Sequence, residues 1–190
     1  MGSFFSSLYS NFLFKNFNSI LMVGLESAGK TAILYKLNPK GPQHFFVEWF
    51  MLEYLNYENF YFTALDLGQN IPYPYKFFWN YYHSHRRTDG IIYIIDSNNK
   101  VMVEEYDLDE IKKILTVEEL KNCPILFLAN KQDLKTALSP VQIKDILELK
   151  KIDGKNWNIK GCSALTGEGI KEGLDWIKSI LNKNINKNCI

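Results

Sequence analysis

Hydrophobic and polar positions along this chain alternate between short apolar runs and longer segments with one apolar face. The runs 91–95 and 124–129 are apolar almost throughout, which is typical of parallel strands buried on both faces. Further strands are predicted at 20–23, 47–55, 60–67 and 157–160. Helices are predicted at 107–115, 139–149 and 170–181, and one more follows the first strand and ends at Leu37. This alternation of strands and helices predicts an α/β fold.

Turn residues define two connections in the first half of the chain. Asn38-Pro39 ends the first helix, and the segment 39–46 after it is predicted to be a loop. The strands 47–55 and 60–67 are predicted to form a hairpin, because the polar segment 56–59 between them has the composition of a turn.

The N-terminal segment 1–17 is predicted to be an amphipathic helix. Its apolar side chains recur at helical spacing, at Phe4, Phe5, Leu8, Tyr9, Phe12 and Leu13. The start, Met1-Gly2 followed by a serine at position 6, fits the signal for N-myristoylation of Gly2. One myristoyl chain binds membranes weakly, so the neighbouring apolar helix predicts a reversible membrane anchor. The alternative is a helix packed permanently on the folded domain.

A phosphate-binding motif joins the first strand to the first helix. Its residues are Gly24-Leu25-Glu26-Ser27-Ala28-Gly29-Lys30-Thr31, which match the pattern G-x-x-x-x-G-K-[ST]. Glycines let the backbone approach phosphate oxygens, and the helix N-terminus, with the amide of Ala32, attracts an anion. Lys30 is predicted to reach the β- and γ-phosphates, and Thr31 to ligate Mg²⁺. Asp66, in the strand 60–67, is predicted to hold the same ion through water. The alternative is a glycine-bearing turn with a chance lysine.

A second motif selects the base. Asn130-Lys131-Gln132-Asp133 follows a buried strand at its carboxyl end, where open α/β sheets bind ligands. The Asp133 carboxylate can accept hydrogen bonds from the N1–H and 2-amino groups of guanine, whereas adenine offers neither donor. Asn130 is predicted to brace the loop, and the stem of Lys131 to cover the base. The segment Ser163-Ala164-Leu165 completes the predicted site, with the Ala164 amide donating to guanine O6.

Composition narrows the class of protein. The 190 residues predict one domain, and 46% hydrophobic with 23% charged residues is ordinary for a globular protein. The net charge of +1 and the scattered basic residues give no support to a nucleic-acid surface. Three cysteines without metal-ligand spacing predict a reducing, cytosolic setting. No apolar run approaches the roughly 20 residues that cross a bilayer.

These motifs resemble the ADP-ribosylation factor (Arf/Arl) branch of the Ras-like small GTPases over residues 1–181. The matching segments are the MG start with its aromatic helix, ILMVGLESAGKTAILYKL, the Asp66 segment, IIDSN, LANKQDL and EGLDWI. The resemblance implies a Ras-like P-loop GTPase fold, a mostly parallel six-stranded sheet with helices on both faces. It divides the chain into the helix 1–17, a G domain at 18–181 and an Asn/Lys-rich tail at 182–190, which is predicted to be disordered.

The resemblance also implies function and partners. It implies GTP/GDP exchange with Mg²⁺, an N-terminal helix released to membranes in the GTP state, and a shift in register of the 47–67 hairpin between states. The implied partners are a guanine nucleotide, a membrane surface, an exchange factor, a GTPase-activating protein and effectors. The implied location is cytoplasmic, with reversible association with the Golgi or other endomembranes.

The chain departs from the family pattern in both switch regions. The place of the switch I threonine falls near Val47, and residues 33–61 contain no serine or threonine to ligate Mg²⁺. The family motif Asp-x-x-Gly-Gln is one residue short here, Asp66-Leu67-Gly68-Gln69. Either Gly68 binds the γ-phosphate and Gln69 is the catalytic residue that orients water, or Gln69 and Asn70 fill these two places. A displacement of about 1 Å can lower a rate about 10²-fold, so GTP hydrolysis is predicted to be weak or absent.

The effector-binding surface departs as well. The hydrophobic patch that the family presents to effectors corresponds to Phe50, to Leu65 in place of a tryptophan, and to Tyr81 or Tyr82. Residues 70–90 form a segment longer than the family norm and rich in aromatic residues, whose rings either pack in the core or bind a partner.

Three functions are considered for a chain with these motifs. The first is a cycling GTPase switch on membranes, and the second is a guanine-nucleotide-binding scaffold that recruits a partner without turnover. A third, a P-loop kinase for a small molecule, is disfavoured because Arg86 and Arg87 are the only arginines and the segment 130–133 would be unexplained.

Overall fold

The computed structural model describes residues 18–47, 50–58, 60–65, 88–152, 154 and 156–187. Within these residues one sheet holds seven strands: β1 (Asn18–Val23), β2 (Gln43–Val47), β3 (Phe50–Tyr57), β4 (Phe60–Leu65), β5 (Gly90–Asp96), β6 (Ile125–Asn130) and β7 (Trp157–Gly161). The strand order is β2-β3-β4-β1-β5-β6-β7. The pairs around β1, β5 and β6 are parallel, and β3 pairs antiparallel with both β2 and β4. The predicted α/β fold with a mostly parallel sheet is confirmed.

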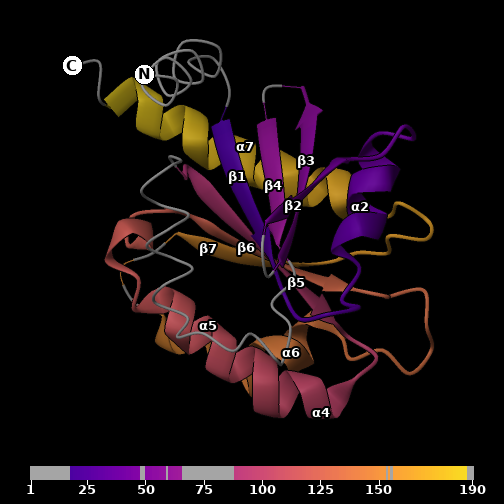
Figure 1. The fold of residues 1–190 in the computed structure, drawn as a ribbon. Coiled ribbons are helices and arrows are strands. Elements are labelled where there is room, and N and C mark those ends of the chain that lie inside the picture. The colour runs from indigo at the N-terminus through magenta and orange to yellow at the C-terminus, as the bar shows by residue number, and fades with distance from the viewer. Residues whose placement is uncertain are drawn as a thin grey trace.

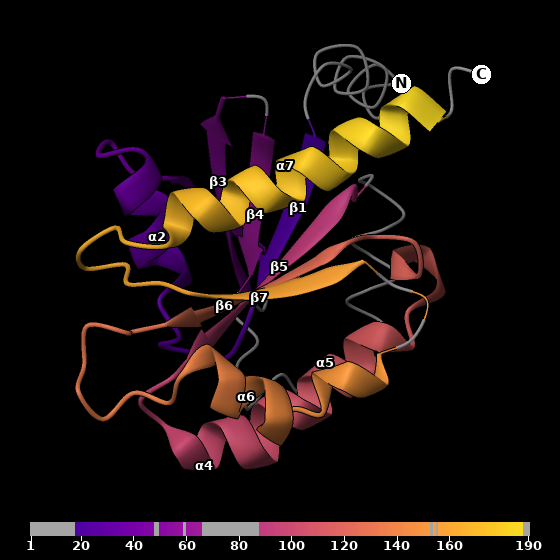
Figure 2. The same cartoon turned by 180° about the vertical axis from the view of Figure 1, so that it is seen from behind.

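The described helical elements are α2 (Lys30–Leu37), α4 (Lys100–Met102), the π-helix η1 (Val103–Asp107), α5 (Leu108–Leu115), η2 (Glu118–Leu120), α6 (Pro140–Ile146), η3 (Leu149–Lys151) and α7 (Ile170–Lys187). Helices α2 and α7 cover one face of the sheet, and α4, α5 and α6 gather on the other (Figure 1). The view from behind shows α7 running across its face with α2 at its start (Figure 2). No described helix is long and apolar enough to cross a bilayer.

Side chains of the central strands point alternately to the two faces of the sheet, and a hydrophobic core lies on each face. Ile91, Tyr93 and Ile95 of β5 pack in the cluster with α5 and α6, whereas Ile92 and Ile94 pack in the cluster with α2 and α7. All five side chains are at most 1% exposed. A strand buried on both faces has no polar side to show, which explains why its sequence is apolar throughout.

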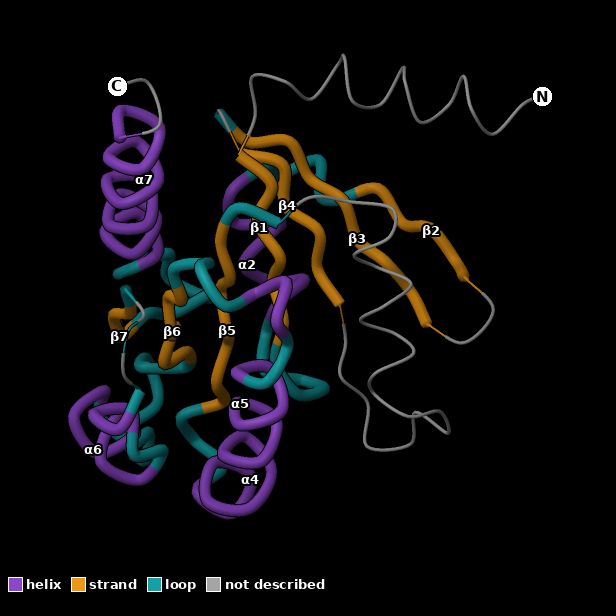
Figure 3. The backbone as a smooth tube through the Cα atoms, turned by 90° about the vertical axis from the view of Figure 1, so that its left-hand side faces the viewer, coloured by secondary structure: helices purple, strands orange, loops and turns teal. Residues whose placement is uncertain are grey.

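The extra strand β2 corrects the prediction of six strands. It lies in the segment predicted as a loop and at the start of the predicted strand 47–55, and it pairs with β3 in the register His44↔Glu53 and Val47↔Phe50. The hairpin of β2 and β3 forms the end of the sheet opposite β7 (Figure 3). Phe45, Phe46 and Val47 favour a strand, but the turn residues Asn38-Pro39 and Gly41-Pro42 come just before them, and the pairing with β3 extends the strand to Gln43.

Two further boundaries differ from the predictions. Helix α7 continues to Lys187, so the predicted disorder of the tail is wrong for 182–187, where no glycine or proline ends the helix. The helix predicted at 107–115 begins earlier, at Lys100, because the Asn99 side chain accepts a hydrogen bond from Met102 N (3.2 Å) and caps it.

Candidate functional site

The site lies where the parallel strands β1, β5 and β6 end. Strands β2–β4 lie on one side of β1 and β5–β7 on the other, so the loops after β1 and β5 separate at this point. Ligands of open α/β sheets bind at such switch points, outside the carboxyl ends of the strands. The loops of 24–29, 97–99, 131–139 and 162–169 therefore decide what can bind.

Two glycines allow the phosphate loop to fold against its neighbours. Gly24 has φ +147° and Gly29 has φ +104°. These are backbone conformations that residues with a Cβ atom rarely adopt. A Cβ on Gly24 would lie 2.3 Å from Ile94 O, and one on Gly29 would lie 2.3 Å from Asn130 Nδ2. The loop can therefore lie directly on β5 and β6 only because these positions lack side chains.

The loop directs a lysine and a row of amides toward one place. Lys30 is 3% exposed, and its Nζ donates to Gly24 O (2.8 Å) and Leu25 O (2.7 Å), which keeps the amine inside the loop. Helix α2 begins at Lys30 with Gly29 as N-cap and without a capping side chain, so no side chain competes for its first amides. The first amides of a helix without a capping side chain, together with a buried ammonium group, form an anion site. This arrangement agrees with the predicted phosphate site.

Asn130 fastens the base-reading loop to the phosphate loop. Its side chain is 1% exposed, its Nδ2 donates to Ala28 O (2.8 Å), and its Oδ1 accepts from the Ala164 amide (2.9 Å). One amide side chain thus joins three loops of the site, which agrees with the predicted bracing role. The predicted bond from Ala164 to guanine O6 differs from the structure, because Asn130 accepts from that amide here. Asn130 would have to share or release the amide for Ala164 to reach a base.

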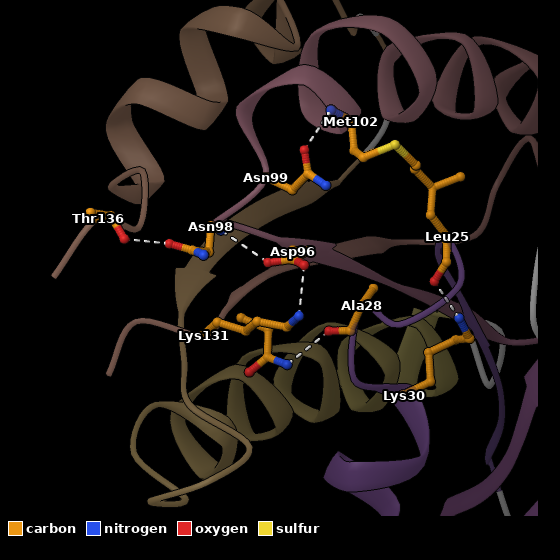
Figure 4. A network of polar contacts seen from close by, with 10 residues as sticks. Leu25, Ala28, Lys30, Asp96, Asn98, Asn99, Met102, Lys131 and Thr136 are labelled. Atoms are coloured by element: carbon orange, nitrogen blue, oxygen red, sulfur yellow. Dashed lines mark hydrogen bonds and ion pairs between the residues drawn. The ribbon is translucent and has the colours of Figure 1, made fainter. Parts of the chain in front are cut away.

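Lys131 is held by an acidic residue on the neighbouring strand. Its Nζ lies 2.6 Å from Asp96 Oδ2, and both side chains are partly exposed (Figure 4). Asp96 and Asn130 are paired in the register of β5 and β6, which brings Asp96 next to the loop that begins at Lys131. The ion pair fixes the direction of the lysine stem along the edge of the site. Asp96 was not among the predicted site residues, although it directly follows the apolar run 91–95.

Asp133 and Ser163 lie next to each other at the base-binding end of the site. Ser163 is 2% exposed and its Oγ donates to Asp133 Oδ1 (2.5 Å), while the same Oγ accepts from Thr166 N (3.1 Å). The Lys36 amine of α2 donates to Leu165 O (2.9 Å), and the Leu165 side chain is 75% exposed. Asp133 itself is exposed, so its carboxylate is available to a ligand. The predicted residues 163–165 therefore lie beside the base-reading motif.

A buried glutamate also belongs to this site and was missed from the sequence. Glu53 of β3 is 4% exposed, and its Oε2 accepts from Thr31 Oγ1 at 2.7 Å. Glu53 shares the inward face of β3 with Leu55, which is 5% exposed. An acidic residue in phase with buried apolar ones was the signal that could have identified it.

The residues present fit a magnesium ion. The Thr31 hydroxyl and the Glu53 carboxylate are hard oxygen donors at the start of α2, the type of ligand that Mg²⁺ prefers. Among the described residues no group of three or more His, Cys, Asp or Glu side chains forms a metal centre by itself. An ion at the start of α2 would be held by these oxygens together with nucleotide phosphates.

Two buried titratable groups lie near the site. Burial raises the pKa of the Cys162 thiol to about 12, so this cysteine is an inert thiol, and its Sγ donates a weak hydrogen bond to Asn130 Oδ1 (3.7 Å). Burial also raises the pKa of Asp107 to about 7, against a hydrogen bond from Tyr93 Oη (2.8 Å) that lowers it.

Several predicted residues lie outside the described part of the chain. These are Gly2, Asp66, Gly68, Gln69 and Tyr81, together with the aromatic segment 70–82. Phe50 and Leu65 are placed only as backbone positions, at the start of β3 and the end of β4. Their predicted roles stay predictions.

Comparison with known proteins agrees with this geometry. The family model of the ADP-ribosylation factor family matches residues 4–181. The chain is similar to ADP-ribosylation factor K of Dictyostelium discoideum, with 36% identity over 185 residues, which cover 96% of this chain and 95% of that protein.

Proposed function

Because the chain belongs to the ADP-ribosylation factor family of GTP-binding small GTPases, we propose that it is a membrane-associated switch in vesicle trafficking with weakened GTP hydrolysis. Guanine-nucleotide binding is supported chiefly by the two hydrogen bonds of the Asn130 side chain. This side chain holds the phosphate loop, the Lys131–Asp133 loop and the 163–165 loop in one arrangement, through Ala28 O and Ala164 N. A phosphate loop and a base-reading motif that are held together in this way favour binding of guanosine diphosphate or triphosphate, with Mg²⁺.

Different residues of the chain are proposed to bind the phosphates, the base and the metal ion. Lys30 and the first amides of α2 neutralise phosphate charge, and Asp133 selects guanine by its two acceptor oxygens. Thr31 would hold Mg²⁺, which supplies charge neutralisation between the phosphates when bound. Ser163 orients Asp133 through its 2.5 Å hydrogen bond.

Weakened hydrolysis is supported by what the switch segments lack. Val47, near the family's switch I threonine, has no group that binds a metal ion, and no serine or threonine occurs at 33–61. The short motif 66–69 misplaces either the glycine or the glutamine. We expect Mg²⁺ to strengthen GTP binding only weakly, and we expect little preference for GTP over GDP.

The second candidate is a nucleotide-binding scaffold that recruits a partner without cycling. The same departures at Val47 and at 66–69 favour it, since a protein that does not turn over needs neither group. A single-turnover assay with labelled GTP, with and without Mg²⁺, tests the choice. Strong Mg²⁺-dependent retention of GTP with measurable hydrolysis would contradict the scaffold.

Binding itself is tested first, with protein stripped of carried-over ligand. We expect uptake of GDP and GTP at micromolar concentration and no uptake of ATP. A protein that binds no guanine nucleotide would contradict the whole proposal. Equal uptake of ATP would still be consistent with phosphate binding by the loop 24–31, but it would contradict the role of Asp133 in selecting guanine.

A further inference from the structure

A lysine of α2 binds the backbone of the loop between β7 and α7. Lys36 lies in the last turn of α2, and its Nζ donates to Leu165 O at 2.9 Å, across 129 residues of sequence. A bond from an ammonium group to a carbonyl is charge-assisted and stronger than one between neutral groups. The Leu165 side chain is 75% exposed, so its packing does not hold the loop in place. The position of residue 165 therefore depends on the bond that its carbonyl makes.

A glycine in the same loop makes room for the lysine. Gly167 has φ +91°, and a Cβ at this position would lie 2.7 Å from Lys36 Cε. The end of the lysine stem thus lies against the backbone at residue 167, while its amine binds the backbone at residue 165. Both ribbon views show this loop next to α2 (Figures 1 and 2). Two contacts along one side chain therefore define where the loop lies relative to the helix.

The other hydrogen bonds of residues 165–167 stay inside the loop. Thr166 N donates to Ser163 Oγ (3.1 Å), and Gly167 N donates to Ser163 O (2.8 Å). Among the described residues, Lys36 is the one side chain from outside 162–169 that forms a hydrogen bond with 165–167. Internal bonds preserve the shape of a loop, but they do not fix its place against the rest of the protein. Lys36 supplies that fixed point.

The residues before Leu165 contact the base-reading motif. Ser163 Oγ donates to Asp133 Oδ1, and Ala164 N donates to Asn130 Oδ1 (2.9 Å). The Ala164 amide has to change partner, at least in part, if it is to bind guanine O6. Lys36 binds the next residue and takes no part in that exchange, so it can hold the loop while the amide changes partner.

Helix α2 also carries the phosphate site at its other end. Lys30 and the first amides of the helix lie in the phosphate loop, whereas Lys36 lies six positions further on, beside the 163–165 loop. Ile33 and Leu34, between these two lysines, are fully buried and anchor the helix in the core. One rigid helix therefore sets the distance between the phosphate site and the base-binding loop.

We propose that Lys36 is a positioning residue of the guanine site, which holds the 163–165 loop beside the base through Leu165 O and so slows the release of a bound guanine nucleotide. The inference rests on the proposed function, because the loop has a base to hold only if the chain binds such a nucleotide. It adds to the site a residue outside the phosphate-loop and base-reading motifs. Lys36 acts through the loop backbone and not by contact with the nucleotide.

The test measures the release of GDP labelled with a fluorophore on the ribose, from the full-length protein in the presence of Mg²⁺. Lys36→Met removes the amine but keeps an unbranched stem. We expect it to release GDP about 3- to 10-fold faster than wild type, the effect of losing one hydrogen bond. Lys112→Met is the matched control, because Lys112 is an exposed lysine in the last turn of α5, which like α2 has 8 residues. It should release GDP at the wild-type rate.

Two further readouts separate a positioning role from a general loss of structure. Lys36→Arg keeps a cationic donor at the end of a flexible stem, and it should restore most of the slow release. The association rate constant of GDP should be unchanged in Lys36→Met, because the phosphate loop and Asp133 remain as in wild type. A variant with a damaged site would instead bind GDP more slowly.

Equal release rates of wild type and Lys36→Met would overturn the inference, since the loop would then be held without the lysine. Release from Lys36→Arg that is as fast as from Lys36→Met would overturn it too, because a donor at this position would not matter. Slower association with unchanged release would show that Lys36 supports the fold and not the bound loop. Wild-type protein without affinity for GDP would refute the proposed function as well, and that result is obtained before any variant is compared.

Discussion

At the scale of single residues, Asp133 should decide which base the protein accepts. Replacing Asp133 by Asn puts an amide N–H group against the donors of guanine and removes charge-assisted hydrogen bonds worth about 1.5–3 kcal/mol each. We expect GDP affinity to fall about 10²-fold or more, measured by displacement of a fluorescent nucleotide. Asp145→Asn, an exposed carboxylate of α6, is the matched control. An unchanged GDP affinity in Asp133→Asn would contradict the assignment of Asp133.

Asp107 should make stability depend on pH. Its pKa is raised from 3.8 to about 7, chiefly by burial, so the folded state holds a proton that the unfolded state releases above about pH 4. A raised pKa of the folded carboxyl means that its contribution to stability is full below about pH 4 and is lost as the pH rises through about 7.

The variant Asp107→Asn removes this titration while keeping an acceptor for Tyr93 Oη. Between pH 5 and pH 8 we expect the free energy of unfolding of wild type to fall by about 3 kcal/mol more than that of Asp107→Asn. Denaturant unfolding at each pH measures it, with the exposed Asp109→Asn as control. Parallel pH profiles of wild type and Asp107→Asn would refute the role of this carboxyl.

At the scale of elements, the contact between the phosphate loop and β6 should tolerate no side chain at Gly29. A Cβ there would lie 2.3 Å from Asn130 Nδ2, and the φ of +104° is already unfavourable for alanine. Gly154 is a matched control, because it also has positive φ (+73°) but no atom within 4 Å of its Cβ position. Both alanine variants should lose about 1 kcal/mol through backbone strain.

Only Gly29→Ala should also displace Asn130 and weaken GDP binding. Thermal unfolding and nucleotide titration of the two variants measure the difference. Equal nucleotide affinities in Gly29→Ala and Gly154→Ala would show that the close approach of loop and strand does not matter for binding.

At the scale of the whole molecule, the proposed membrane association depends on a segment outside the described residues. Protein produced with myristoylation should float with lipid vesicles, and Gly2→Ala should reduce vesicle binding about tenfold or more, because stable anchoring needs two membrane-binding signals and this variant retains only the apolar helix. Mass spectrometry of the N-terminus verifies the acylation. Vesicle binding that is unaffected by Gly2→Ala would favour a helix that binds membranes without acylation or packs permanently on the domain.

Much of the fold and part of the site could be predicted from local patterns. The buried runs at 91–95 and 124–129 identified β5 and β6, because a strand covered on both faces must be apolar at every position. The phosphate loop and the segment 130–133 were recognisable because their chemistry is carried by neighbouring residues. The strand β2 was missed because turn residues, Asn38-Pro39 and Gly41-Pro42, come just before it, and its pairing with β3 is not visible in the sequence.

The sequence by itself determined the α/β fold, the phosphate loop and the base-reading motif, since each depends on residues only a few positions apart. Only the tertiary structure decided that Asn130 holds Ala28 across 102 residues, that Glu53 reaches Thr31 across 22, and that Asp107 is buried on Tyr93. The physical reason is that strand register and helix packing set these distances, and neither is encoded in the spacing of the residues that meet.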